Sequence, residues 1–152
     1  MLFSVAEASA DIRWEQRFQN FRRAYSLLRE AIGDTELAEL DQLQQEGVIQ
    51  RFEYTFELAW KTLKDYLEFN GVNLPVATPR SVVKACAATG LFLDAGISGE
   101  TYLTMLDDRN ALSHTYDFAR FRIILAVVKS QYLPELTRQY EYLFGKLVEY
   151  NG

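Results

Sequence analysis

The sequence predicts an all-α protein, an antiparallel up-and-down bundle of four main helices plus one short helix. Apolar residues recur at steps of three and four through most of the 152 residues. No segment alternates apolar and polar residues convincingly, as a half-buried strand would. Short connections between the helical segments are typical of antiparallel neighbours. We therefore expect one bundle domain over residues 12–149, preceded by a flexible segment, residues 1–11, with weak periodicity.

The first predicted helix carries a stripe of large apolar residues and ends near Gly33, which suits a C-terminal cap. A second amphipathic stretch begins with Leu37, Leu40 and Leu43, has a candidate break or kink at Gly47, and stops at residues 70–71. On its outer side Glu57 precedes Lys61 by four residues, the favourable order for a helical ion pair. The two stripes consist of Trp14, Phe18, Phe21, Tyr25, Leu28 and Ile32, and of Ile49, Phe52, Phe56, Leu63 and Leu67.

Three polar residues are predicted to begin the remaining helices. Thr78, followed by proline, caps a short third helix that ends near Gly90. Ser98 caps a fourth helix and Asp117 a long fifth one, which Pro134 should bend or divide because proline lacks an amide donor. The inward residues of these two helices are Tyr102, Met105, Leu106 and Leu112, and then Phe121, Leu125, Val128, Tyr132, Leu136, Tyr140, Leu143 and Leu147.

Composition narrows the possible functions. The formal net charge of −5 and a pI of about 4.9 argue against a broad nucleic-acid-binding face, although a small cleft for one phosphodiester stays possible. The longest apolar run, residues 123–128, is too short to cross a bilayer, and the N-terminus lacks the pattern of a signal peptide. The single cysteine, Cys86, allows no internal disulfide or cysteine zinc site and is expected to be buried. We expect a cytoplasmic protein without membrane contact.

Polar chemistry concentrates between Arg109 and Tyr116, around the single histidine of the chain, His114. On a helix, Arg109 and Tyr116 share nearly one face, while Asn110 and His114 lie one turn apart on an adjacent face. Arginine offers a planar fork of donors for a phosphate, and histidine moves protons near neutral pH. A structural interpretation stays open, in which Arg109 pairs with Asp107, Asp108 or a neighbouring helix and the histidine and tyrosine simply finish the helix.

Arg109-x4-His114-x-Tyr116 matches the Arg-x4-His-x-Tyr element of HEPN proteins (higher eukaryotes and prokaryotes nucleotide-binding). The chain resembles the branch described as nucleotidyltransferase substrate-binding proteins, over about residues 12 to 145. More specific support comes from the segment RFEYTFELAWKTLKDYL, residues 51–67. Tyr102 departs from this branch, which commonly has a tryptophan at that position, although an aromatic residue is kept. Further matches are Arg13-Trp14, Arg17-Phe18, Asn20-Phe21, and Asn110 with Ser113-His114.

The resemblance implies a homodimer in which the Arg-x4-His segments of two chains meet at a shared cleft. It implies a toxin with metal-independent endoribonuclease activity, and a small nucleotidyltransferase antitoxin that attaches adenylate to Tyr116. We assign catalysis to Arg109 and His114, with Asn110 and Ser113 supporting the phosphate or the imidazole. No metal or other cofactor is expected.

Two other functions stay open at this point. The chain could be a noncatalytic subunit that binds a nucleotide or a substrate for the nucleotidyltransferase, with Arg109 on a phosphate and Tyr102 or Tyr116 stacked on a base. The acidic pI fits this function slightly better than free RNA binding. Alternatively, the chain is a purely structural interaction domain whose motif forms an ion-pair network.

Overall fold

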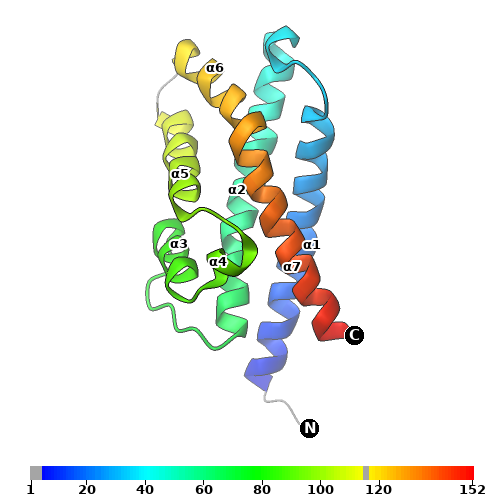
Figure 1. Ribbon diagram of the computed structural model, residues 1–152, viewed down its shortest axis with the longest axis vertical. Coiled ribbons are helices and arrows are strands. Elements are labelled where there is room, and N and C mark those ends of the chain that lie inside the picture. The colour runs from blue at the N-terminus through cyan, green and yellow to red at the C-terminus, as the bar shows by residue number, and fades with distance from the viewer. Residues whose placement is uncertain (1–4, 115–116) are drawn as a thin grey trace.

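The computed structural model confirms the all-α prediction. It describes residues 5–114 and 117–152, with side chains over 13–113 and 117–152, and this part of the chain contains helices and no strand. Helices α1 (Val5–Ile32) and α2 (Gln42–Phe69) form the most extensive pair and stand side by side (Figure 1). A short 3₁₀ turn, η1 (Leu37–Glu39), lies in the connection between them.

The second half of the chain covers the α1–α2 pair. Helices α3 (Pro79–Ala88), α4 (Leu91–Ala95) and α5 (Gly99–His114) lie on the α2 side. Helix α6 (Phe118–Val127), the π-helical turn η2 (Val128–Tyr132) and α7 (Leu133–Asn151) form one run that crosses the pair diagonally in Figure 1. The four main helices of the bundle are therefore α1, α2, α5 and the α6–α7 run.

The predicted core stripes are confirmed. Every residue predicted on the α1 stripe and on the Ile49–Leu67 stripe of α2 is buried, as are Tyr102, Met105 and Leu106 of α5. Leu112, Phe121 and Tyr140 are partly buried and pack against this core. Tyr140 stacks on Tyr25 with ring centroids 5.0 Å apart, which ties α7 to α1. Cys86 is buried as predicted, and burial raises the pKa of its thiol to about 12.

The predicted caps are confirmed in place. The Thr78 hydroxyl accepts from Ser81 N at 3.1 Å, and the Ser98 hydroxyl accepts from Thr101 N at 3.1 Å. The Asp117 carboxylate accepts from Ala119 N at 3.0 Å. Pro134 lies in the first turn of α7, directly after the π-helical turn, so the predicted division of the last helix is also confirmed.

Several predictions about element boundaries are corrected. Gly47 does not break α2, which runs uninterrupted from a capping box of Asp41 and Gln44. That cap leaves Leu43 in the first turn with 78% of its surface exposed, so Leu43 is not part of the apolar stripe. Helix α1 begins at Val5, before the predicted start of the first apolar stripe.

A second short helix, α4, was not predicted. It occupies one turn between Gly90 and Gly96, whose φ angles of 83° and 71° lie in the left-handed region that favours glycine. The two glycines allow the chain to turn on either side of α4. The predicted single short helix is therefore two, α3 and α4.

No helix within residues 5–114 or 117–152 is both long and apolar enough to span a membrane.

Candidate functional site

Arg109 makes the interaction that organises the candidate site. Its Nη2 donates to Oε2 of Glu57 on α2 at 2.8 Å, and the second carboxylate oxygen of Glu57 lies 3.2 Å from Nζ of Lys61. Arg109 Nη1 donates weakly to Oδ1 of Asn110 at 3.4 Å. The Arg109 side chain is 29% exposed, so part of the guanidinium group is accessible from solvent while part is committed to Glu57.

Of the partners considered for Arg109, the neighbouring helix is the one found. The predicted ion pair between Glu57 and Lys61 is confirmed. Glu57 also binds Arg109, and this second contact joins α2 to α5 across 52 residues of sequence. The Nε atom of Arg109 is buried and has no hydrogen-bond partner within the described part of the chain. A buried donor without a partner costs free energy. The Nε atom of Arg109 can therefore bind one further acceptor if the side chain shifts.

A second carboxylate belongs to this site. Glu53 lies one turn before Glu57 on α2, and burial raises its pKa while the positive charge of Arg109 lowers it. Arg109 therefore acts electrostatically on two acidic residues of α2. No sequence pattern selects Glu53 or Glu57 as site residues. Their spacing of four on the helix that carries Lys61 was the available signal, but nothing in that pattern identified α5 as the partner.

Asp107 and Asp108 fix the rest of this helix turn to other elements. Asp107 accepts from Nη2 of Arg80 on α3 at 3.0 Å. Asp108 accepts a short hydrogen bond from the hydroxyl of Tyr132 in the π-helical turn, and Arg120 of α6 lies 3.4 Å from its other oxygen. Three consecutive α5 side chains thus contact α3, the α6–α7 run and α2, which fixes the rotation of α5 about its axis.

The remaining motif residues are described to different extents. Asn110 is half-buried beside Arg109, and the exposed Ser113 donates to the Arg109 carbonyl oxygen at 3.4 Å. His114 is the last residue of α5, and its side chain is outside the described part. Tyr116 is likewise outside it, so the predicted shared face with Arg109 is untested. The structure brings Arg109, Asn110 and Ser113 together at the end of α5.

Tyr102 is corrected as a candidate ligand contact. Its side chain is fully buried, and its hydroxyl donates to Oε1 of Gln139 at 2.8 Å. Its ring packs on Phe92 with centroids 5.4 Å apart. Because no face of the ring reaches solvent, Tyr102 is part of the core and cannot stack on a nucleotide base.

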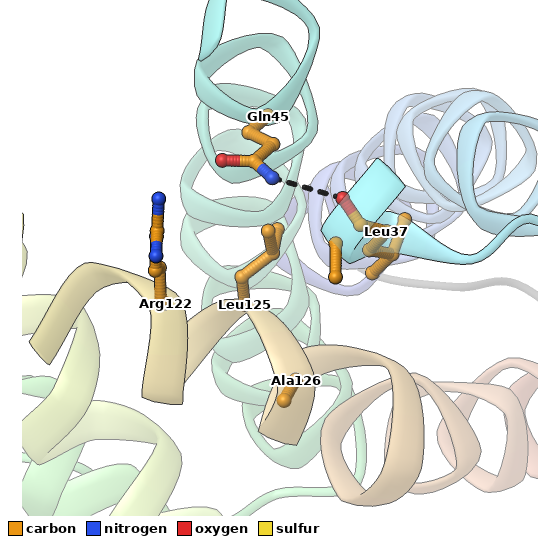
Figure 2. A pocket seen from close by; sticks show the side chains of 6 residues that line it. Leu37, Gln45, Arg122, Leu125 and Ala126 are labelled. Carbon is orange, nitrogen blue, oxygen red and sulfur yellow. Dashed lines mark hydrogen bonds between the residues drawn. The ribbon is translucent and has the colours of Figure 1, made fainter. Parts of the chain in front are cut away.

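A well-formed pocket lies elsewhere, between η1, α2 and α6 (Figure 2). Its volume is about 190 Å³, and it is lined mainly by apolar groups, with Gln45 and Arg122 as polar residues at its wall. Gln45 Nε2 donates to the Leu37 carbonyl oxygen at 3.0 Å, which closes one side. None of the motif residues whose side chains are described, Arg109, Asn110 and Ser113, lines this pocket. Within the described residues, no group of three or more His, Cys, Asp or Glu side chains could hold a metal ion.

The fold and the site define a helical-bundle protein with an arginine-containing motif at the end of one main helix. Residues 16–144 match the family described as nucleotidyltransferase substrate binding protein like, and the chain belongs to this family. A crystal structure of a protein from Thermus thermophilus is similar, with 33% sequence identity and a TM-score of 0.64. The similarity covers 84% of this chain and 98% of that one. Among curated proteins, none matches the chain.

Proposed function

We propose that this protein is a HEPN-type toxin, a metal-independent endoribonuclease that acts through Arg109 and His114. The observation that carries the proposal is the guanidinium group of Arg109, which is partly exposed and is anchored to Glu57 of the neighbouring helix. An arginine held in this way, five residues before the histidine that ends α5, offers a fixed fork of donors for a phosphate. Family membership over residues 16–144 supports a nucleotidyltransferase as the partner of this protein.

Cleavage of RNA by these groups needs no metal. A base removes the proton of a ribose 2′-hydroxyl, and that oxygen attacks the adjacent phosphorus. The bond from phosphorus to the 5′-oxygen of the next nucleotide breaks, and that oxygen takes up a proton. The products are a 2′,3′-cyclic phosphate and a 5′-hydroxyl. His114 transfers the protons, Arg109 stabilises the charge on the phosphate oxygens, and Asn110 and Ser113 support the phosphate or the imidazole.

A homodimer gives this reaction a second proton-transfer group. One chain has a single histidine, whereas cleavage benefits from both a base and an acid. A two-fold axis near the end of α5 would bring a second copy of Arg109 and His114 to the same cleft. We expect this dimer to act in the cytoplasm.

A small nucleotidyltransferase is the proposed antitoxin. The Tyr116 phenol oxygen attacks the α-phosphorus of ATP bound to that enzyme, pyrophosphate leaves, and an adenylate ester forms on the tyrosine. The added negative charge and bulk would repel and block RNA. Co-expression with the enzyme should add one adenylate to the peptide that contains Tyr116. Tyr116→Phe should stay unmodified, with Tyr54→Phe, which removes an exposed tyrosine of α2, as the control that is still modified.

The ribonuclease proposal is tested on purified protein with RNA and a chelator. Arg109→Ala and His114→Ala should each lower the cleavage rate by about 10²-fold or more. Arg80→Ala is the matched control, because Arg80 also pairs with an α5 carboxylate but lies outside the motif. Cleavage at the wild-type rate in both motif variants would eliminate the proposal.

A noncatalytic binding subunit is the second candidate. The description of the matched family, nucleotidyltransferase substrate binding protein like, favours it. In this function the cleft holds a nucleotide for the partner nucleotidyltransferase. Calorimetric titration with AMP, set beside the RNA assay, separates the two candidates: AMP binding that depends on Arg109, without RNA cleavage, selects the binding subunit.

A further inference from the structure

The Glu57 carboxylate forms ion pairs with two cationic side chains at once. One carboxylate oxygen accepts from Arg109 at 2.8 Å and the other lies 3.2 Å from Nζ of Lys61. All three side chains are about one-third exposed, so the cluster lies at the surface and solvent reaches it. The geometry of a carboxylate against a guanidinium group is the same that a phosphate would adopt. Glu57 therefore occupies one of the Arg109 donors that a phosphate would need.

The structure also supplies a second cationic partner for the Glu57 carboxylate. Lys61 lies one turn further along α2 and already pairs with it. If a phosphate oxygen replaces Glu57 at Arg109, the carboxylate keeps one cationic partner and is not left unpaired. Glu53, which also feels the charge of Arg109, adds a further negative charge that an entering phosphate has to overcome.

We propose that Glu57 is a specificity-determining residue that competes with phosphate esters for Arg109, so that binding proceeds by exchange of its carboxylate for a phosphate oxygen. This inference rests on the proposed function, because it takes Arg109 as the phosphate-binding group. The exchange lowers the affinity for any single weakly held phosphate. It favours ligands with several phosphates, such as an RNA strand, which bring additional contacts to offset the cost of displacing Glu57.

The same helix provides a matched control. Glu68 also bridges an arginine and a lysine, with Arg13 Nη1 and Lys64 Nζ each 3.2 Å from one of its oxygens. Its side chain is 26% exposed, close to the 31% of Glu57. At ~1.5 Å per residue, Glu68 lies roughly 16 Å from Glu57 along α2, beyond the Debye length of about 8 Å at physiological salt. A change at Glu68 removes the same charge without touching Arg109.

The experiment measures binding apart from cleavage. The probe is a short fluorescein-labelled oligonucleotide with 2′-O-methyl groups, which lacks the attacking hydroxyl and cannot be cut. Fluorescence anisotropy at about 0.15 M salt gives Kd for the wild type, Glu57→Gln, Glu68→Gln, Arg109→Ala and the double variant Glu57→Gln/Arg109→Ala. Glutamine keeps an acceptor for Arg109 and removes the charge. Thermal unfolding of each variant verifies that it is folded.

Glu57→Gln should bind the probe about 2- to 5-fold more tightly than the wild type, which corresponds to the free energy of an exposed ion pair. Glu68→Gln should bind as the wild type does, and the double variant should bind as weakly as Arg109→Ala. Unchanged or weaker binding by Glu57→Gln, or an equal gain in Glu68→Gln, overturns the competition while a loss in Arg109→Ala still supports the proposed site. Wild-type binding by Arg109→Ala overturns the proposed phosphate site together with this inference.

Discussion

Tyr132, the last residue of the π-helical turn, donates its hydroxyl hydrogen to the carboxylate of Asp108, the residue directly before Arg109. The tyrosine is fully buried, and its ring stacks on Phe52 with centroids 5.7 Å apart. The π-helical turn ends at this tyrosine, so an irregular turn of the last helical run is linked to the motif-bearing helix. Burial raises the pKa of Tyr132, and the Asp108 carboxylate that accepts its hydrogen bond raises it further.

We predict that Tyr132→Phe lowers the free energy of unfolding by about 1.5–3 kcal/mol, the range for a hydrogen bond to a charged group. The ring and its stacking on Phe52 are retained, so the loss reports on the bond to Asp108. Urea denaturation measures it.

Tyr25→Phe is the matched control for this measurement. Tyr25 is also buried, but its hydroxyl bonds the neutral hydroxyl of Thr137 at 2.7 Å. Its loss should cost only about 0.5–1.5 kcal/mol. Equal losses in the two variants would contradict a special role for the Asp108 bond.

A second prediction concerns alkaline pH. Burial raises the pKa of Cys86 from 9.0 to about 12, so the unfolded chain releases this proton before the folded protein does. The stabilising contribution is complete below pH 9 and is lost as the pH rises towards 12. The wild type should therefore lose stability more steeply than Cys86→Ala between pH 9 and 10, by up to about 1.4 kcal/mol per pH unit.

The control is Tyr142→Phe. Its phenol also has a raised pKa, from 10.0 to about 12, and so contributes only above pH 10. Urea denaturation at a series of pH values should show the Cys86→Ala effect first. Parallel pH profiles for the wild type and Cys86→Ala would disprove the buried-thiol explanation.

Two glycines should respond to alanine with opposite signs. Gly47 lies inside α2 with nothing within 4 Å of an added Cβ, so Gly47→Ala should raise stability by about 0.5–1 kcal/mol. Gly90 also has open space around it, but its φ of 83° disfavours a side chain. Gly90→Ala should lower stability by about 1–2 kcal/mol. Thermal unfolding measures both, and a destabilised Gly47→Ala would indicate that α2 is interrupted there.

The single histidine makes a direct test of the site possible by NMR. If Arg109 and His114 share one phosphate site, inorganic phosphate should shift the ring signals of His114 and raise its pKa, because a nearby anion favours the charged imidazolium. A proton NMR titration, with and without phosphate, measures this. Arg109→Ala should abolish the effect and Arg80→Ala should preserve it. A phosphate-independent pKa in the wild type would separate His114 from the phosphate site.

The sequence by itself determined the main helices, three of the helix caps and most of the core. Periodicity placed Trp14, Phe18 and Leu28 inward, and the short side chains of Thr78, Ser98 and Asp117 began helices as predicted, because these signals act within one or two turns. The motif stretch around Arg109 was also visible, as a cluster of polar residues at a helix end.

Only the tertiary structure decided which groups surround Arg109. The ion pair with Glu57 joins residues 52 apart, and the bond from Tyr132 to Asp108 joins residues 24 apart. The partners of the buried Tyr102, which are Phe92 and Gln139, depend equally on how α4 and α7 pack on α5. Local patterns specify which face of a helix is apolar, but the partner of a polar side chain depends on the position and rotation of a helix that is distant in the sequence.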